Sequence, residues 1–280
     1  MAKTELRLDS SSLITSDLIR KHDPASGLAA DPHELRERTA QLALILDLAY
    51  QGFVGQQPAA AIVDRLAGRL HDLRREASPG VWRQLIPLAQ EHRVAKYLIQ
   101  DPFTRWSFEK PRGYSGDASL LDIYYKHPSA AGIVESSSTL GQAIYAYTSD
   151  APSSVAGRER RDILTRSVDE TASRVDEAEI LTIACGHLRE AESSKALAQG
   201  RLKRWVGLDQ DPVSVAIANR DLPGTAVEAR DGSVRGILRR AYDLGTFDLV
   251  YASGLYDYLP RAIGIRLLQR SMELVKPGGK

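Results

Sequence analysis

The segment ILTIACGHLREA, residues 180–191, constrains the fold of this chain more than any other part of the sequence. Ile180–Ile183 has the pattern of a buried strand, which breaks at the small residues Ala184 and Gly186 and is predicted to run directly into a helix. Such a turn directs unpaired backbone N–H groups and the helix dipole at one point, where a polar or anionic group of a nucleotide can bind. A dinucleotide loop of the G-x-G-x-x-G type needs three glycines, and only Gly186 is present.

Composition limits the remaining possibilities. The 280 residues are 43% hydrophobic, which is enough for one sizeable core or two smaller ones, and the net charge of +1 gives no reason to expect a nucleic-acid partner or an anionic membrane surface. The single cysteine, Cys185, excludes an intrachain disulfide and a multi-cysteine metal site. The N-terminus is polar, and no apolar run reaches the roughly 18 residues of a membrane span. We therefore expect a cytoplasmic protein without a metal site or membrane insertion.

The first half of the chain is predicted to be helical. Residues 1–150 are interpreted as a helical N-terminal lid or substrate domain, with Asp31-Pro32 as a helix start. The expected helices cover residues 31–49, 58–76, 78–99, 118–125 and 140–147. Residues 101–117, DPFTRWSFEKPRGYSGD, are predicted to be an irregular loop because they combine aromatic residues, prolines and glycines. Loops rich in aromatic residues are more often functional than simple connectors.

Residues 151–280 have a different pattern, in which short apolar strands alternate with helices. The predicted strands are 179–183, 204–208, 225–229 and 248–252, and the predicted helices are 157–175, 188–197, 212–219 and 232–242. This alternation predicts an α/β domain with a parallel sheet covered on both faces. The carboxyl ends of the strands then meet at one edge, where ligands bind in such folds.

Acidic residues follow two of these strands. Asp209 lies 23 positions after Gly186 (209 − 186), close to the spacing at which doubly wound nucleotide-binding folds place an acid on a ribose diol. Its alternative role is to cap the helix that begins at Pro212, although Asp211 is better placed for that. Asp231, followed by Gly232, can receive an exocyclic amine, or it can cap the next helix.

The order of these motifs resembles that of the class I S-adenosylmethionine-dependent methyltransferases. ILTIACG, GLDQDP, ARDGS, FDLVYASGLYDYL and LVKPGG follow one another within residues 155–280. ACGHLRE and GLYDYL, with FEKPRGYSGD upstream, are similar to a bacterial subgroup that includes 3-hydroxypalmitic acid methyl ester biosynthesis proteins. The resemblance implies a Rossmann-like sheet over residues 151–280, the cofactor S-adenosyl-L-methionine and methylation of a small molecule.

By this resemblance, the motif residues are expected to contact particular parts of the cofactor. Ala184 and Gly186 are expected to contact the methionine part, and Asp209 the ribose. Gln210 is expected beside the adenine or ribose, and Asp231 and Gly232 beside the adenine. Ser253 and Tyr114 are the other expected cofactor-binding residues. Tyr114 is equally interpreted as part of a turn between helices. One of Arg158, Arg160 and Arg161 is expected to meet the cofactor carboxylate.

Two positions depart from the family pattern. Thr182 stands where many members have an acidic residue, and Ala184 stands where they have glycine. Alanine permits close approach of the cofactor if its φ angle is negative. On the acceptor side we expect Tyr256, Asp257 and Tyr258, with Asp257 as the base among them; packing at the sheet edge is the alternative for the two tyrosines.

Methyl transfer from a sulfonium mainly requires alignment of the reactants in a dry pocket. A carboxylate acceptor needs no general base, so the favoured acceptor is a carboxyl or hydroxyl oxygen of a lipid-like or small organic acid. There are two alternative functions. One is a nicotinamide-dependent oxidoreductase, although the three-glycine loop of that class is missing here. The other is a catalytically degenerate domain that acts as a binding or regulatory partner. A homodimer is compatible with the sequence. The chain reaches only the turn into a fifth strand, so we expect a fragment of a longer protein, or a partner chain over the edge of the fourth strand.

Overall fold

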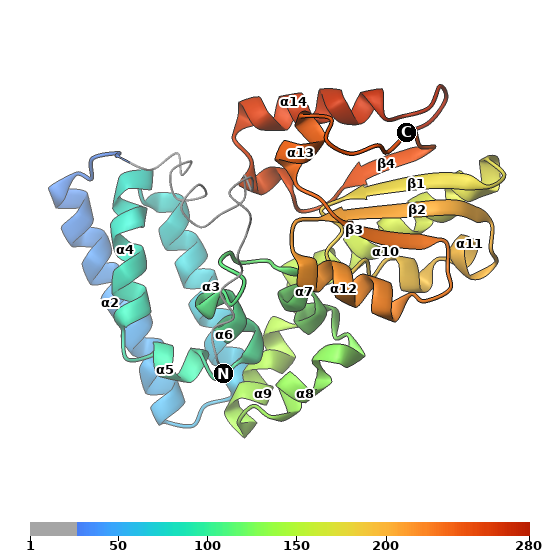
Figure 1. The fold of residues 1–280 in the computed structure, drawn as a ribbon. Coiled ribbons are helices and arrows are strands. Elements are labelled where there is room, and N and C mark those ends of the chain that lie inside the picture. The colour runs from blue at the N-terminus through green and yellow to red at the C-terminus, as the bar shows by residue number, and fades with distance from the viewer. Residues whose placement is uncertain (1–26) are drawn as a thin grey trace. The chain divides into compact units, whose positions relative to one another are not determined.

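The computed structural model describes residues 27–280, which divide into two compact units (Figure 1). The helical unit contains residues 27–111 and Ser119–Val155, and the sheet unit contains Arg112–Ala118 and Ala156–Lys280. The short segment Arg112–Ala118 therefore belongs with the sheet, although it lies far from it in sequence. The predicted division into residues 1–150 and 151–280 placed this segment in the N-terminal domain.

The helical unit follows the predicted pattern of helices for most of its length. Its elements are α2 (Pro32–Val54), α3 (Ala59–Glu76), α4 (Pro79–Glu91), α5 (Ala95–Leu98), α6 (Pro102–Glu109), α7 (Ala118–Tyr125), η1 (Pro128–Ala130), α8 (Ala131–Glu135) and α9 (Thr139–Thr148). Asp31 caps α2 by accepting hydrogen bonds from the N–H groups of His33 and Glu34, as the sequence predicted. The core of this unit is formed by apolar faces of α2, α3, α4 and α9.

The expectation that residues 101–117 contain no regular helix is wrong for the first half of the segment. Asp101 accepts hydrogen bonds from the N–H groups of Phe103 and Thr104, and Pro102 occupies the first helical position, so α6 forms. The helix ends at Lys110, whose φ of +48° is left-handed. Only the remaining residues, up to the start of α7, form the irregular loop that the aromatic and glycine content predicted.

The sheet unit has the predicted α/β architecture. Its elements after α10 (Pro152–Arg174) are β1 (Ala178–Ile183), η2 (Ala191–Ser193), α11 (Lys195–Ala198), β2 (Leu202–Asp209), α12 (Pro212–Asp221), β3 (Val227–Asp231), α13 (Val234–Leu238), β4 (Leu249–Ala252), η3 (Tyr256–Tyr258) and α14 (Arg261–Glu273). The four strands are parallel in the order β3-β2-β1-β4. This is the strand order at the centre of a Rossmann-like sheet, so the predicted fold class is confirmed.

Alternate side chains of the strands enter two different cores. On β1, Ile180 packs in a core with α10, α11 and α12, whereas Leu181 and Ile183 pack in a core with α13 and α14. The same alternation places Trp205 of β2 in the first core and Val206 in the second. Helices thus cover both faces of the sheet, and only its edges and strand ends remain for polar groups (Figure 1).

The helix predicted directly after β1, at residues 188–197, is wrong. Gly186 and Leu188 both have left-handed backbones, with φ of +54° and +53°, so a turn replaces the first helical residues. Only η2 and the four-residue α11 follow, and Ser194 caps α11 by accepting a hydrogen bond from the N–H of Leu197. No helix begins directly after β1, although the first residue of α7, Ala118, lies beside Gly186.

The outer edge of β4 is paired by the last residues of the chain. Lys276 N–H donates to the Phe247 carbonyl (2.8 Å), and Lys280 both donates to the Asp248 carbonyl and accepts from Val250 N–H (3.0 and 2.9 Å). These bonds follow the pattern of a parallel ladder. Residues 276–280 therefore pair with the beginning of this edge, as far as Val250.

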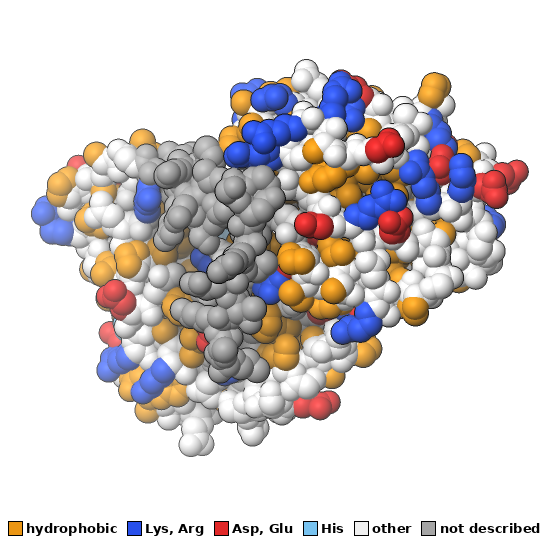
Figure 2. Space-filling model, viewed as in Figure 1, with side chains coloured by type: hydrophobic (Ala, Val, Ile, Leu, Met, Phe, Trp, Pro, Cys, Tyr) orange, Lys and Arg blue, Asp and Glu red, His pale blue; other side chains and the backbone are white. Residues whose placement is uncertain are grey.

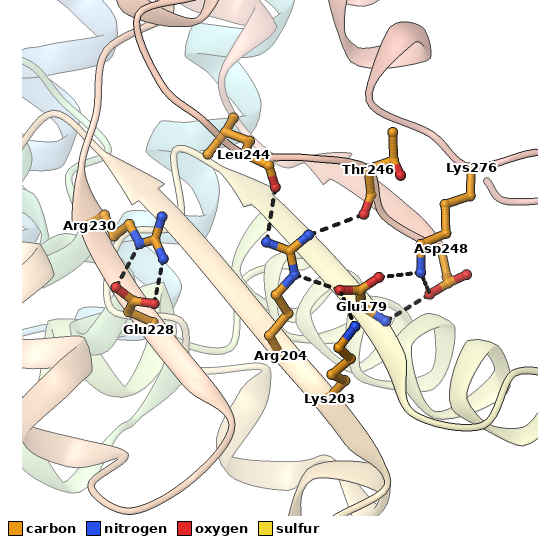
Figure 3. A network of polar contacts seen from close by, with 9 residues as sticks. All are labelled: Glu179, Lys203, Arg204, Glu228, Arg230, Leu244, Thr246, Asp248 and Lys276. Carbon is orange, nitrogen blue, oxygen red and sulfur yellow. Dashed lines mark hydrogen bonds and ion pairs between the residues drawn. The ribbon is translucent and has the colours of Figure 1, made fainter.

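A charged network lies at the amino-terminal ends of the strands (Figure 3). Glu179 of β1 accepts a hydrogen bond from Arg204 Nε (2.8 Å) and forms ion pairs with Lys203 and Lys276. Lys276 also contacts Asp248, whose carboxylate accepts the Glu179 N–H (2.8 Å). These cations hold the pKa of the Glu179 carboxyl at about 2, against the opposing effect of burial.

On the face shown in Figure 2, positive and negative side chains are interspersed over the sheet unit. None of the helices in residues 27–280 is long and apolar enough to cross a membrane.

Candidate functional site

The turn after β1 places the small residues Ala184 and Gly186 at the carboxyl edge of the sheet. Ala184 has a φ of +57°, so the condition of a negative φ, under which alanine permits close approach of the cofactor, is not met. A left-handed alanine costs about 1–2 kcal/mol, which the surrounding structure must offset. Gly186 is also left-handed, and a Cβ there would lie only 3.1 Å from the Ala118 Cβ. The turn is therefore strained at Ala184 and at Leu188, and it leaves little space for a side chain at Gly186.

Asp209 ends β2 beside this turn. Its two carboxylate oxygens accept the N–H groups of Gly186 (2.7 Å) and Asp211 (2.9 Å), which fixes the side chain between the first and second strand ends. Burial raises the pKa of Asp209 to about 6, and the charge of Asp211 raises it too, while the two N–H groups and His187 lower it. A carboxylate with two N–H partners still has lone pairs for a pair of hydroxyl groups.

The alternative role of Asp209 as a helix cap is wrong, because Asp211 caps α12. The Asp211 carboxylate accepts the N–H of Val213 and the hydroxyl of Ser214 (3.0 and 3.1 Å). Gln210, between the two acids, is partly buried at the same strand end.

Asp231 ends β3 directly opposite Asp209 in the strand register. Its side chain is exposed, and it does not cap α13, because Ser233 does so by accepting the Gly236 N–H (3.1 Å). Gly232 is buried and donates its N–H to the Asp209 carbonyl (2.8 Å). Asp231 is thus a second acid at this edge with its carboxylate open to solvent.

The residues after β4 divide into two groups. Ser253 is partly buried at the strand end, whereas Tyr256 and Asp257 are exposed in η3. A Cβ on Gly264 would lie 3.3 Å from the Tyr256 ring, so this ring lies along α14. Tyr258, in contrast, donates its hydroxyl to the Ser115 carbonyl.

The segment Arg112–Ala118 is attached to the strand ends by several contacts. The Arg112 guanidinium forms two hydrogen bonds with Asp211, one of them from Nε to Oδ2 at 3.0 Å. Tyr114 packs edge-on against Tyr258, with ring centroids 5.7 Å apart. Gly116 has a φ of +88° and lies so close to the Tyr258 hydroxyl that a Cβ would be 2.6 Å from it.

Tyr114 therefore lies among the predicted site residues. Burial raises the pKa of its phenol, and the negative charges of Asp209, Asp117 and Asp211 raise it further. Tyr114 lies in the turn between α6 and α7, near Asp209, Asp117 and Asp211, so the structure is compatible with both alternatives for this residue.

Two further residues at this edge carry opposite charges. The Glu190 carboxyl is 8% exposed, accepts the Tyr251 hydroxyl (2.7 Å), and has its pKa raised by burial. The Arg160 guanidinium, on α10, lies 3.8 Å from where a Cβ of Gly254 would be, just after β4. Sequence analysis included Arg160 among three arginines but missed Glu190, because an acid in a turn ordinarily faces solvent.

The remaining candidates have structural roles. Thr182 accepts the Trp205 indole N–H (2.9 Å), which explains a neutral residue at this position of β1. Cys185 is buried against Gly207, and burial raises the pKa of its thiol, so it is a poor nucleophile.

No protein-family model and no curated protein matches this chain. Among solved structures, a possible exported protein from Bordetella parapertussis is 22% identical, with a TM-score of 0.50 over 90% of this chain and 72% of that one. This likeness shows a shared fold.

Two other similar structures have names that include S-adenosylmethionine (SAM). CalS10, a SAM-bound amino pentose methyltransferase from Micromonospora echinaspora involved in calicheamicin biosynthesis, is 26% identical over 45% of this chain, with a TM-score of 0.34. This chain spans about half of CalS10 (52%). The structure of LepI in complex with SAM is 13% identical, with a TM-score of 0.37 over 93% of this chain and 75% of that one.

Proposed function

We propose that the carboxyl edge of the sheet binds S-adenosylmethionine and that the protein transfers its methyl group to a small molecule. The favoured acceptor is a carboxyl or hydroxyl oxygen of a lipid-like or small organic acid. The helical unit is proposed to act as a lid or to contribute to acceptor binding. When bound, S-adenosylmethionine supplies an electrophilic methyl group on a sulfonium.

One observation carries this proposal. The site combines an acid suited to a ribose, Asp209, with a β1 end that lacks a following helix. A dinucleotide site needs a helix N-terminus there to bind its pyrophosphate. S-adenosylmethionine is a nucleoside without a pyrophosphate, so its binding needs only an acid for the ribose and a backbone that the ligand can approach closely. The turn therefore supports this ligand over a nicotinamide dinucleotide.

The residues at the edge fit the parts of this cofactor. Asp209 has lone pairs for a ribose diol, and Asp231 on the neighbouring strand offers an exposed acceptor to an adenine amine. Arg160 and Glu190 are a cation and a buried acid near the ends of β4 and β1, suited to the carboxylate and ammonium of the methionine part. We assign these roles as proposals.

The acceptor side is proposed to lie at η3. Asp257 is exposed there and is the base for an acceptor hydroxyl, whereas a carboxylate acceptor is already ionised at neutral pH and needs none. Tyr258 is proposed to shape the pocket, since its hydroxyl is already bonded to the Ser115 carbonyl. Tyr256 is the weakest of the three candidates because its ring lies along α14.

The test is calorimetry with S-adenosylhomocysteine, followed by methyl transfer from labelled S-adenosylmethionine to a panel of carboxylic acids. Asp209→Ala should weaken binding by about 1–3 kcal/mol, because the ribose hydroxyls lose a charged partner. Glu273→Gln, which removes a surface acid of α14 paired with Arg240 and Arg270, should leave binding unchanged. An unchanged affinity in Asp209→Ala would remove Asp209 from the site.

The second candidate is a catalytically degenerate domain that binds the cofactor as a regulatory signal. The left-handed Ala184 favours it, because this residue stands in place of the family's glycine at the point of closest approach. Binding without turnover across the panel would support this candidate, and turnover would exclude it.

A further inference from the structure

We propose that Arg112 is a positioning residue of the cofactor site, which pairs with Asp211 so that the adjacent Asp209 remains a charged, oriented acceptor. The inference rests on the proposed role of Asp209 in ribose binding. It assigns a function to a residue outside the strands, in the motif FEKPRGYSGD, of which only Tyr114 was expected to contact the cofactor.

The contacts form a continuous series from the segment Arg112–Ala118 to the end of β1. Arg112 bonds the Asp211 carboxylate through two nitrogens, and both side chains are largely buried, with 12% and 5% exposed. The Asp211 N–H bonds one oxygen of Asp209, and the Gly186 N–H bonds the other. Moving Asp211 would therefore also move a hydrogen-bond donor of Asp209.

The second effect of Arg112 is electrostatic. Asp209 and Asp211 are buried acids two residues apart, and the charge of Asp211 raises the pKa of Asp209. The Tyr114 phenol and the Cys185 thiol beside Asp209 are neutral, because their pKa values are raised, and His187 lowers the pKa of Asp209. The Arg112 guanidinium is always charged and offsets Asp211 directly.

Without Arg112, the pair of carboxyls should bind a proton more readily. An opposite charge in contact typically lowers a carboxyl pKa by ~1–3 units, so removing Arg112 from Asp211, two residues from Asp209, should raise the Asp209 pKa above its value of about 6, by about one unit. At pH 6.5 the ionised fraction of Asp209 would then fall about threefold, and at pH 8.5 it would hardly change.

The experiment compares wild type with Arg112→Gln, Arg112→Lys, Asp211→Asn and the double variant Arg112→Gln/Asp211→Asn. Asparagine is a good helix cap, so the start of α12 is preserved. Carboxyl ¹³C NMR on the ligand-free protein follows the titration of Asp209, identified by its loss in Asp209→Asn. Calorimetry with S-adenosylhomocysteine at pH 6.5 and 8.5 follows binding.

We expect the midpoint of the Asp209 carboxyl titration to rise by about one pH unit in Arg112→Gln and to fall in Asp211→Asn. In the double variant it should return towards the wild-type value. Arg112→Lys, which keeps the charge, should lie near wild type. Binding should weaken about threefold at pH 6.5 in Arg112→Gln, recover at pH 8.5, and recover at both pH values in the double variant.

A solely structural role would give a different pattern. If Arg112 only anchors the segment Arg112–Ala118, Arg112→Gln would weaken binding equally at both pH values and would leave the titration midpoint of Asp209 unchanged. The double variant would then not recover affinity. That result overturns the inference. If wild type fails to bind S-adenosylhomocysteine at any pH, the proposed function fails, while the NMR titrations still decide whether Arg112 controls the charge of Asp209.

Discussion

The charged network at the start of β1 offers the sharpest test of the energetics (Figure 3). Glu179→Gln keeps the size of the side chain but removes the charge that Arg204, Lys203 and Lys276 share. The pKa of Glu179 is about 2 in the folded protein and 4.5 ordinarily. This difference corresponds to about 3 kcal/mol at ~1.4 kcal/mol for each pH unit.

That figure is an upper bound, because the cations of the network reach solvent. The Lys203 side chain is 60% exposed and Arg204 and Lys276 about a third, so screening reduces their contribution. We expect Glu179→Gln to lower the free energy of unfolding by about 1–2 kcal/mol at pH 7. Because the folded pKa is lowered, this stabilisation is fully present above pH 4.5 and is lost as the pH falls towards 2.

The assay is urea unfolding of wild type and variant at pH 7.0 and 3.5. Glu228→Gln is the matched control, since it is also a strand glutamate paired with an arginine, Arg230, but 58% exposed; its effect should stay below about 0.5 kcal/mol. Equal losses in the two variants, or a loss in Glu179→Gln that is the same at both pH values, would refute the reasoning.

Three further results are expected at the carboxyl edge. Affinity for S-adenosylhomocysteine, measured by calorimetry from pH 5 to 8, should fall as the pH drops through about 6, because protonated Asp209 accepts hydroxyl groups poorly, and Asp209→Asn should abolish this dependence. Gly186→Ala should destabilise the protein in urea by about 1 kcal/mol more than Gly224→Ala, since both are left-handed but only the first Cβ would crowd the start of α7; equal losses would contradict the close contact. Tyr258→Phe removes the hydrogen bond to the Ser115 carbonyl, so it should lower the free energy of unfolding by about 1 kcal/mol and speed proteolysis within residues 112–118. Unchanged cleavage would show that this bond does not hold the segment.

Much of the sheet unit was predictable because its signals are local. Buried parallel strands need continuous apolar runs, so Ile180–Ile183 and the strand before Asp209 were recognisable, and Asp211-Pro212 marked the start of α12. The position of Asp209 at the carboxyl edge of the sheet followed from the parallel arrangement alone. The φ angle of Ala184 was not predictable, because a left-handed alanine is unfavourable by itself and is held only by its surroundings in the folded protein.

The sequence by its local patterns thus determined which segments are strands, which are helices and which acids end the strands. Tertiary structure decided what those ends meet. The Arg112–Asp211 pair joins residues 99 positions apart, and the burial of Glu190 depends on Tyr251 from a strand 61 positions later. Hydrogen bonds and charges act over a few ångströms in space and leave no periodic mark along the chain, so the chemistry of this edge became visible only once the chain had folded.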